Sequence, residues 1–171
     1  MPSPALQLFE TYQGGIIVYF LQPGDPGYTA PDTNGLIVYP QLLGTAQWGC
    51  YGTQLDVFGT ALGTGSTNTA SIVAGCTQDG TAAKICSDLN VGGYSDWYLP
   101  SQNELNEVYL VRSSLSFLNT SAGYWSSSET AVDVNFTVLN TAYAQLFGQP
   151  SNSQVSTSKS NPYYVIAMRS F

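Results

Sequence analysis

The order of the apolar segments is the strongest constraint on how this chain can fold. β-Branched and aromatic runs at residues 14–21 and 35–39 are typical of strands, whereas three separate stretches between residues 66 and 114 show helical spacing. Strand-type patterns then return at residues 124–129, 132–139, 143–147 and 163–168. Because strands and helices do not alternate regularly, the sequence predicts an α+β fold with antiparallel strand pairing.

A capping box gives the clearest local signal. The Ser101 hydroxyl can accept from the amide of Glu104, and the Glu104 carboxylate can accept from the amide of Ser101. Apolar residues at helical spacing follow this pair, so the sequence predicts a helix over 102–114. Both capping residues are therefore interpreted as structural.

Two shorter helices are expected before that one. The first would be capped by Ser66 or Thr67 and closed by Gly75, and the second would be capped by Thr81 and reach Leu89. The fold is therefore expected to hold two or three helices.

The chain has the length of one domain, 171 residues. Residues 1–12 are interpreted as an N-terminal arm or edge segment, and residues 13–171 as a single domain. The polar stretch 148–161 is expected to be an exposed loop. The Gly- and Thr-rich stretch 43–66 is expected to be an ordered loop, because it contains large side chains to bury: Trp48, Tyr51 and Phe58.

Scarcity of charge excludes several functions. Only 9% of residues are charged, the net charge is −7, and there is no histidine. Nucleic acids, anionic lipids and sulfated glycans all favour basic surfaces, so these partners are disfavoured. Histidine-dependent triads and zinc sites are excluded. The apolar run 15–21 is too short to span a membrane, so no membrane insertion is expected. The N-terminus lacks the features of a signal peptide, so the chain is expected either to be made without secretion, which Met1 favours, or to be excised from a longer secreted protein.

The three cysteines leave two alternatives open. Cys50, Cys76 and Cys86 can all be small buried apolar side chains. Alternatively, Cys76 and Cys86 form a disulfide that closes a short loop and leaves Cys50 free.

No residue pattern points to catalysis. Glu104 is explained by the capping box, and no feature pairs Glu129 with a second carboxylate, so a glycosidase site is not expected and the protein is interpreted as non-enzymatic. Trp97 and Trp125 are expected in the core. Arg169, one of only four cations, is expected in a buried or interface bidentate pair.

A metal cofactor is not expected. Calcium is possible, because side chains with hard oxygen atoms are plentiful in this chain, but the spacing of these side chains matches no calcium-binding loop. The candidate ligands are Asp25, Asp32, Asn34 and Asp133.

Several blocks together carry a family resemblance over residues 14–171. The most specific are Trp97-Tyr98-Leu99-Pro100-Ser101 and Tyr124-Trp125-Ser126-Ser127-Ser128-Glu129, supported by Trp48-Gly49-Cys50-Tyr51-Gly52 and Ala167-Met168-Arg169-Ser170-Phe171. In this order they resemble the C-terminal domain family of the Legionella collagen-like adhesin, as found in phage and bacterial surface proteins. The resemblance implies a C-type-lectin-like fold in which the first and last strands, 15–21 and 163–168, pair.

The resemblance also implies a role in adhesion, often as a trimer. One member of that family binds sulfated glycosaminoglycans, but four cations on an acidic chain favour a neutral glycan or a protein instead. The implied ligand-binding face spans residues 129–147, although these positions can equally be solvated strand residues. Its candidate residues are Glu129, Asp133, Asn135, Asn140, Tyr143 and Gln145, of which Tyr143 and Gln145 are expected to be exposed.

The expected function is therefore a virion adhesion module of a phage tail or fibre, located on the virion surface. Its partners would be a host-surface glycan or protein, other virion subunits and further copies of itself. One alternative is a structural decoration, collar or fibre-cap protein without its own receptor. A second alternative is an adhesin domain of a bacterial surface or pilus tip, which would be extracellular.

Overall fold

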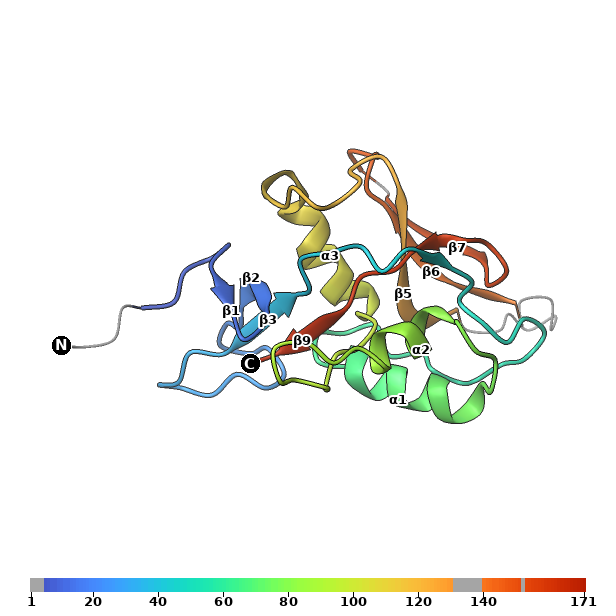
Figure 1. The fold of residues 1–171 in the computed structure, drawn as a ribbon, viewed down its shortest axis with the longest axis horizontal. Coiled ribbons are helices and arrows are strands. Elements are labelled where there is room, and N and C mark those ends of the chain that lie inside the picture. The colour runs from blue at the N-terminus through green and yellow to red at the C-terminus, as the bar shows by residue number, and fades with distance from the viewer. Residues whose placement is uncertain (1–4, 131–139, 152) are drawn as a thin grey trace.

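Two β-sheets and three α-helices build the part of the chain that the computed structural model describes, residues 5–130, 140–151 and 153–171 (Figure 1). All but one of the strand pairings between named strands in this part are antiparallel. The predicted α+β class is confirmed.

The first sheet joins strands from both ends of the chain. Its order is β1 (Thr11–Tyr12), β2 (Gly15–Phe20), β3 (Gly35–Val38) and β9 (Met168–Ser170). The direct pairing of first and last strands implied by the resemblance is wrong, because β3 lies between β2 and β9. β3 can take this central place because all four of its residues are buried.

The N-terminal segment takes part in this sheet. β1 forms its edge, and the Phe9 amide donates to the Ile17 carbonyl at 2.8 Å. Residues 9–12, within the stretch interpreted as an arm or edge segment, therefore lie along β2.

The second sheet has the order β4 (Thr45–Ala46), β8 (Tyr163–Tyr164), β5 (Gly123–Glu129), β6 (Thr141–Leu146) and β7 (Gln154–Ser158). Among the described strands of this sheet, β5 and β8 are the pair that runs parallel. The expectation that 148–161 is wholly an exposed loop is wrong, since β7 pairs with β6 along its length. The strand expected over 132–139 lies outside the described residues.

The strand expected over 163–168 is divided between the two sheets. β8 belongs to the second sheet and β9 to the first, and the residues between them are extended and buried. Val165 and Ala167 face one core cluster, whereas Ile166 and Met168 face the other. This alternation lets one segment connect both cores.

The helices start and end close to the predicted positions. α1 (Gly65–Gly75) follows Thr64 rather than Ser66 or Thr67, and α2 (Ala82–Ser87) follows Thr81 but stops before Leu89. The helix predicted over 102–114 is shorter than expected. α3 spans Gln102–Leu110, and a 3₁₀ turn, Arg112–Ser114, follows it.

The helices cover different parts of the two sheets. α3 contacts β2 of the first sheet and both β5 and β6 of the second, so it lies between the sheets (Figure 1). α1 and α2 pack together, with α1 against β5. Trp97 and Trp125 are buried in the core cluster that α1 and α2 help to form. No described helix is long and apolar enough to cross a membrane.

Candidate functional site

A long connection between β4 and α1, residues 47–64, has no regular secondary structure, yet buried groups hold it along its length. We call it the anchored loop. Loops of this length inside a folded domain are usually functional or disordered. The anchored loop is ordered, because a disulfide, a buried ion pair and two further sets of hydrogen bonds fix its backbone.

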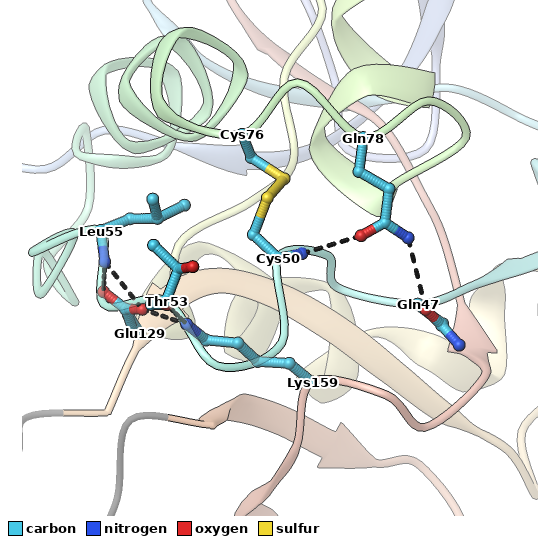
Figure 2. The surroundings of a disulfide bond; sticks show 8 residues. All are labelled: Gln47, Cys50, Thr53, Leu55, Cys76, Gln78, Glu129 and Lys159. Carbon is cyan, nitrogen blue, oxygen red and sulfur yellow. Dashed lines mark hydrogen bonds and ion pairs between the residues drawn. A yellow bond between two sulfur atoms is a disulfide. The ribbon is translucent and has the colours of Figure 1, made fainter.

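The disulfide ties the start of this loop to the end of α1. It joins Cys50 to Cys76, with Cα atoms 5.8 Å apart (Figure 2). The predicted alternative of a Cys76–Cys86 bond is wrong. Cys86 is buried on α2 against the core, with its Sγ 3.5 Å from the Ile166 carbonyl oxygen, and burial raises the pKa of its thiol.

A buried ion pair fixes the middle of the loop. Glu129 at the end of β5 and Lys159 just after β7 form the pair, and their side chains are 1% and 0% exposed (Figure 2). The Glu129 carboxylate accepts from the amides of Leu55, at 3.0 Å, and Val57, at 3.3 Å. The Lys159 ammonium donates to the Thr53 carbonyl at 2.6 Å. Both charges are thus satisfied partly by loop backbone, as a buried pair requires.

The capping box of α3 also holds the end of the loop. The Glu104 carboxylate accepts from the amide of Ser101 at 2.8 Å and from the amide of Gly63, within the loop, at 2.9 Å. The Ser101 hydroxyl donates to the carbonyl of Ala61 at 2.8 Å. Burial raises the pKa of Glu104, although these amides act in the opposite direction.

Two further buried side chains converge on one carbonyl of the loop. The Gly59 carbonyl accepts from the Ser128 hydroxyl at 2.7 Å and from the Asn68 amide at 2.6 Å. A third bond runs from the Asn103 backbone amide to the Thr60 carbonyl at 2.9 Å. The loop backbone is therefore held by α1, α3 and β5 at once.

The aromatic side chains of the loop do not all face inward as expected. Trp48 is buried, and the Lys159 ammonium lies 4.7 Å from its ring centre. Tyr51 and Phe58 are instead 61% and 42% exposed. A fixed backbone therefore presents two large aromatic side chains to solvent, a composition typical of protein and glycan recognition surfaces.

The ligand-binding candidates from the sequence fall into three groups. Glu129 and Gln145 are buried, Asn140 and Tyr143 are half-buried, and Asp133 and Asn135 lie outside the described residues. Both Glu129 and Asn140 bind the anchored loop, the latter by accepting from the Gly52 amide. These two residues therefore position the loop instead of facing solvent.

All four cations of the chain are engaged by neighbouring groups. Lys159 pairs with Glu129, Lys84 pairs with Asp88, and Arg112 donates to the Phe147 and Tyr109 carbonyls at 3.0 and 2.7 Å. The fourth, Arg169, pairs with Asp96.

Arg169 is a buried structural residue, but its contacts are not the bidentate pair expected. Its Nε donates to Asp96, its Nη1 donates to Gln13, and its guanidinium lies 3.9 Å from the Tyr94 ring centre. The side chain thereby joins β9 to two loops.

The calcium candidates do not converge in the described part of the chain, where no cluster of three Asp, Glu or Cys side chains occurs. Asp25 accepts from the Tyr19 hydroxyl and the Gln22 amide, both at 2.8 Å. Asn34 donates to the Gly27 carbonyl, Asp32 is exposed, and Asp133 lies outside the described residues.

Sequence reasoning missed Lys159, which is central to this site. It lies in a polar stretch that resembled a loop, so nothing local indicated burial. The available signal was its rarity, because a cation in a chain with only four is expected to have a partner.

Comparison with known proteins identifies a fold likeness. No protein-family model matches the sequence, and no curated protein matches it. Among solved structures, a fimbrial protein from Bacteroides ovatus ATCC 8483 superposes with a TM-score of 0.58 at 15% sequence identity. The match covers 90% of this chain but 43% of that one, so this chain spans less than half of the fimbrial protein. At this identity the likeness shows the fold alone.

Proposed function

We propose that this protein is a non-enzymatic adhesion module that works outside the cell and uses the anchored loop to contact its partner. One observation carries this proposal: buried groups fix the backbone of the anchored loop, and the same loop exposes the side chains of Tyr51 and Phe58. Rigid aromatic side chains contribute large contact areas at little entropic cost. The partner would be a glycan or protein on another cell surface.

Two observations support an extracellular location. Disulfides such as Cys50–Cys76 persist in oxidising compartments and on cell and virion surfaces. The fold is similar to that of a protein described as fimbrial. Of the two settings, a bacterial surface appendage is therefore favoured over a phage fibre, which remains a second candidate because of the sequence blocks described above.

Further features of the family resemblance belong to this proposal. A C-type-lectin-like arrangement and assembly into trimers would both suit a module at the tip of an appendage. A non-enzymatic role is supported by Glu104 and Glu129, whose carboxylates are occupied by backbone amides of the anchored loop.

The test is a binding assay with loop variants. The purified chain, labelled with a fluorophore, would be incubated with a panel of bacterial and epithelial cells. We expect binding to at least one cell type, weakened at least about tenfold by Tyr51→Ser or Phe58→Ser, which corresponds to about 1.4 kcal/mol. Tyr28→Ser, an exposed tyrosine on a different loop, is the matched control.

Circular dichroism and thermal unfolding would show that each variant is folded. The proposal fails if no cell type binds, or if folded Tyr51→Ser and Phe58→Ser variants bind as well as the Tyr28→Ser control.

A further inference from the structure

A polar hollow lies between α3 and the start of β7, away from the anchored loop. Its volume is about 410 Å³, within the range of small-molecule sites. The residues that line it are uncharged side chains that offer amides, hydroxyls and one aromatic ring: Asn106, Tyr109, Pro150, Ser151, Ser153 and Gln154.

Gln145 joins two of these lining residues from the adjacent strand β6. Its Nε2 donates to Asn106 Oδ1 at 2.9 Å and to Ser153 Oγ at 3.0 Å, and the Gln145 side chain is 1% exposed. Asn106 Oδ1 and Ser153 Oγ therefore act as acceptors for Gln145. The amide hydrogens of Asn106 and the hydroxyl hydrogen of Ser153 can still be donated to another group. Within the described residues, Gln145 Oε1 has no hydrogen-bond partner.

Gln154 is held in place at another wall of the hollow. Its Oε1 accepts from Gln102 Nε2 at 3.1 Å, and its Nε2 donates to the Gln102 carbonyl at 3.3 Å. The polar groups of the hollow are therefore positioned before any ligand arrives, which lowers the entropic cost of binding.

The hollow offers no free positive charge to an anionic ligand. Arg112, in the 3₁₀ turn that follows α3, lies over the ring of the lining residue Tyr109 at 3.8 Å and donates to the carbonyls of Phe147 and Tyr109. An anionic ligand would therefore meet no uncommitted positive charge there. Tyr109 also packs edge-on against Phe147, with ring centres 5.6 Å apart, so recognition must depend on hydrogen bonds more than on ring stacking.

We propose that this hollow binds one uncharged sugar unit, with Asn106 and Ser153 as donors to its hydroxyl groups. Sugar hydroxyls both donate and accept, which matches a neutral site built from amides and hydroxyls. This inference rests on the proposed adhesive function. It adds a ligand class, an uncharged sugar, and a binding site, the hollow beside α3.

The experiment is an NMR titration of the isotope-labelled protein with uncharged sugars: glucose, galactose, mannose and N-acetylglucosamine. Each is added to tens of millimolar, about tenfold above a millimolar Kd. We expect saturable shifts of the Asn106 side-chain amide and the Gln154 backbone amide with at least one sugar. The site is overturned if none of the four sugars gives saturable shifts there.

Two variants make the test specific. Asn106→Asp keeps the oxygen that accepts from Gln145 but removes the amide donors, and Ser151→Trp fills the hollow from its exposed rim. Both should abolish the shifts at Gln154 or weaken binding at least about tenfold. Asn103→Asp, an exposed position on the same helix, should leave binding unchanged, and equal loss in this control would also overturn the site.

Failure of the site and failure of the adhesive function give different results. Cell binding by the wild-type protein, together with no saturable shift from any of the four sugars, overturns the hollow as a sugar site and leaves adhesion standing. Sugar binding at the hollow without attachment to any cell supports the site and overturns the adhesive function.

Discussion

Lys159 and Glu129 form an ion pair that is closed to solvent on both sides, and each partner also binds the backbone of the anchored loop. Removing two charges from water is costly, so such a pair is maintained only where its remaining hydrogen-bonding capacity is satisfied. Here the loop supplies those partners. The same contacts therefore offset the free-energy cost of burying the two charges and fix the position of the loop.

Breaking this ion pair should be strongly destabilising. Lys159→Met leaves Glu129 buried without its cation, and we expect a loss of about 3–5 kcal/mol in the free energy of unfolding. Adding Glu129→Gln should recover part of that loss, with a coupling energy of about 0.5–3 kcal/mol in a double-mutant cycle measured by urea denaturation. The exposed pair offers a matched control, because Lys84→Met should cost less than about 1 kcal/mol. Equal losses for both lysines would contradict this account.

Removing the disulfide should loosen the anchored loop more than the sheets. We expect Cys50→Ala to lower the free energy of unfolding by about 2–4 kcal/mol, because the unfolded chain is no longer cross-linked. Hydrogen exchange should accelerate over residues 50–57. In urea denaturation, a reductant should lower the free energy of unfolding of the wild-type protein but leave that of the Cys50→Ala variant unchanged. A further loss on reduction of that variant would indicate a different pairing.

The cysteines should react in a fixed order. Because Cys86 is buried and its thiol pKa is raised, we expect no reaction with a thiol reagent in the native, unreduced protein. Denaturation should release one thiol, and denaturation with reduction should release all three. Colorimetric titration measures these values, and a reactive thiol in the native state would be inconsistent with the structure.

Glu104 should make stability depend on pH in a predictable direction. Its pKa is higher in the folded protein than in the unfolded chain, where it is about 4.3, so its contribution is greatest below that value and falls as the pH rises through the folded pKa. Glu104→Gln places an amide group among backbone donors and should cost about 1–3 kcal/mol. This cost should shrink as the pH rises through the folded pKa of Glu104, because only the wild-type protein, and not the Gln variant, loses stability there.

Urea denaturation at several pH values measures the Glu104 effect. Glu10→Gln is the control, since this carboxylate is exposed and its replacement should change stability by less than about 0.5 kcal/mol at each pH. A cost of Glu104→Gln that grows with pH would refute the assigned direction.

Features encoded within a few residues could be predicted from the sequence. The Ser101–Glu104 box is a local pattern, and α3 begins where it indicates. The strands β2 and β3 were predicted because their residues are apolar or aromatic, and β5 was predicted because it opens with the aromatic pair Tyr124 and Trp125. In each case the signal and the structure share the same short segment.

Features that depend on distant partners could not be predicted in this way. β7 is a polar edge strand that lacks apolar alternation, so only its pairing with β6 identifies it. The partner of Cys76 is set by where the anchored loop passes α1, which spacing along the chain does not reveal. The same holds for Glu129, whose burial depends on its ion pair with Lys159, a residue 30 positions further along the chain.

The engagement of all four cations by neighbouring groups has a kinetic consequence. The seven excess negative charges have no basic patch to balance them locally, so the domain should be repelled by anionic envelopes. Dissolved salt shortens the reach of this repulsion, to about 8 Å at physiological ionic strength. Attachment to an anionic cell wall should therefore become faster as salt is added, the reverse of the behaviour of a protein steered by lysine and arginine.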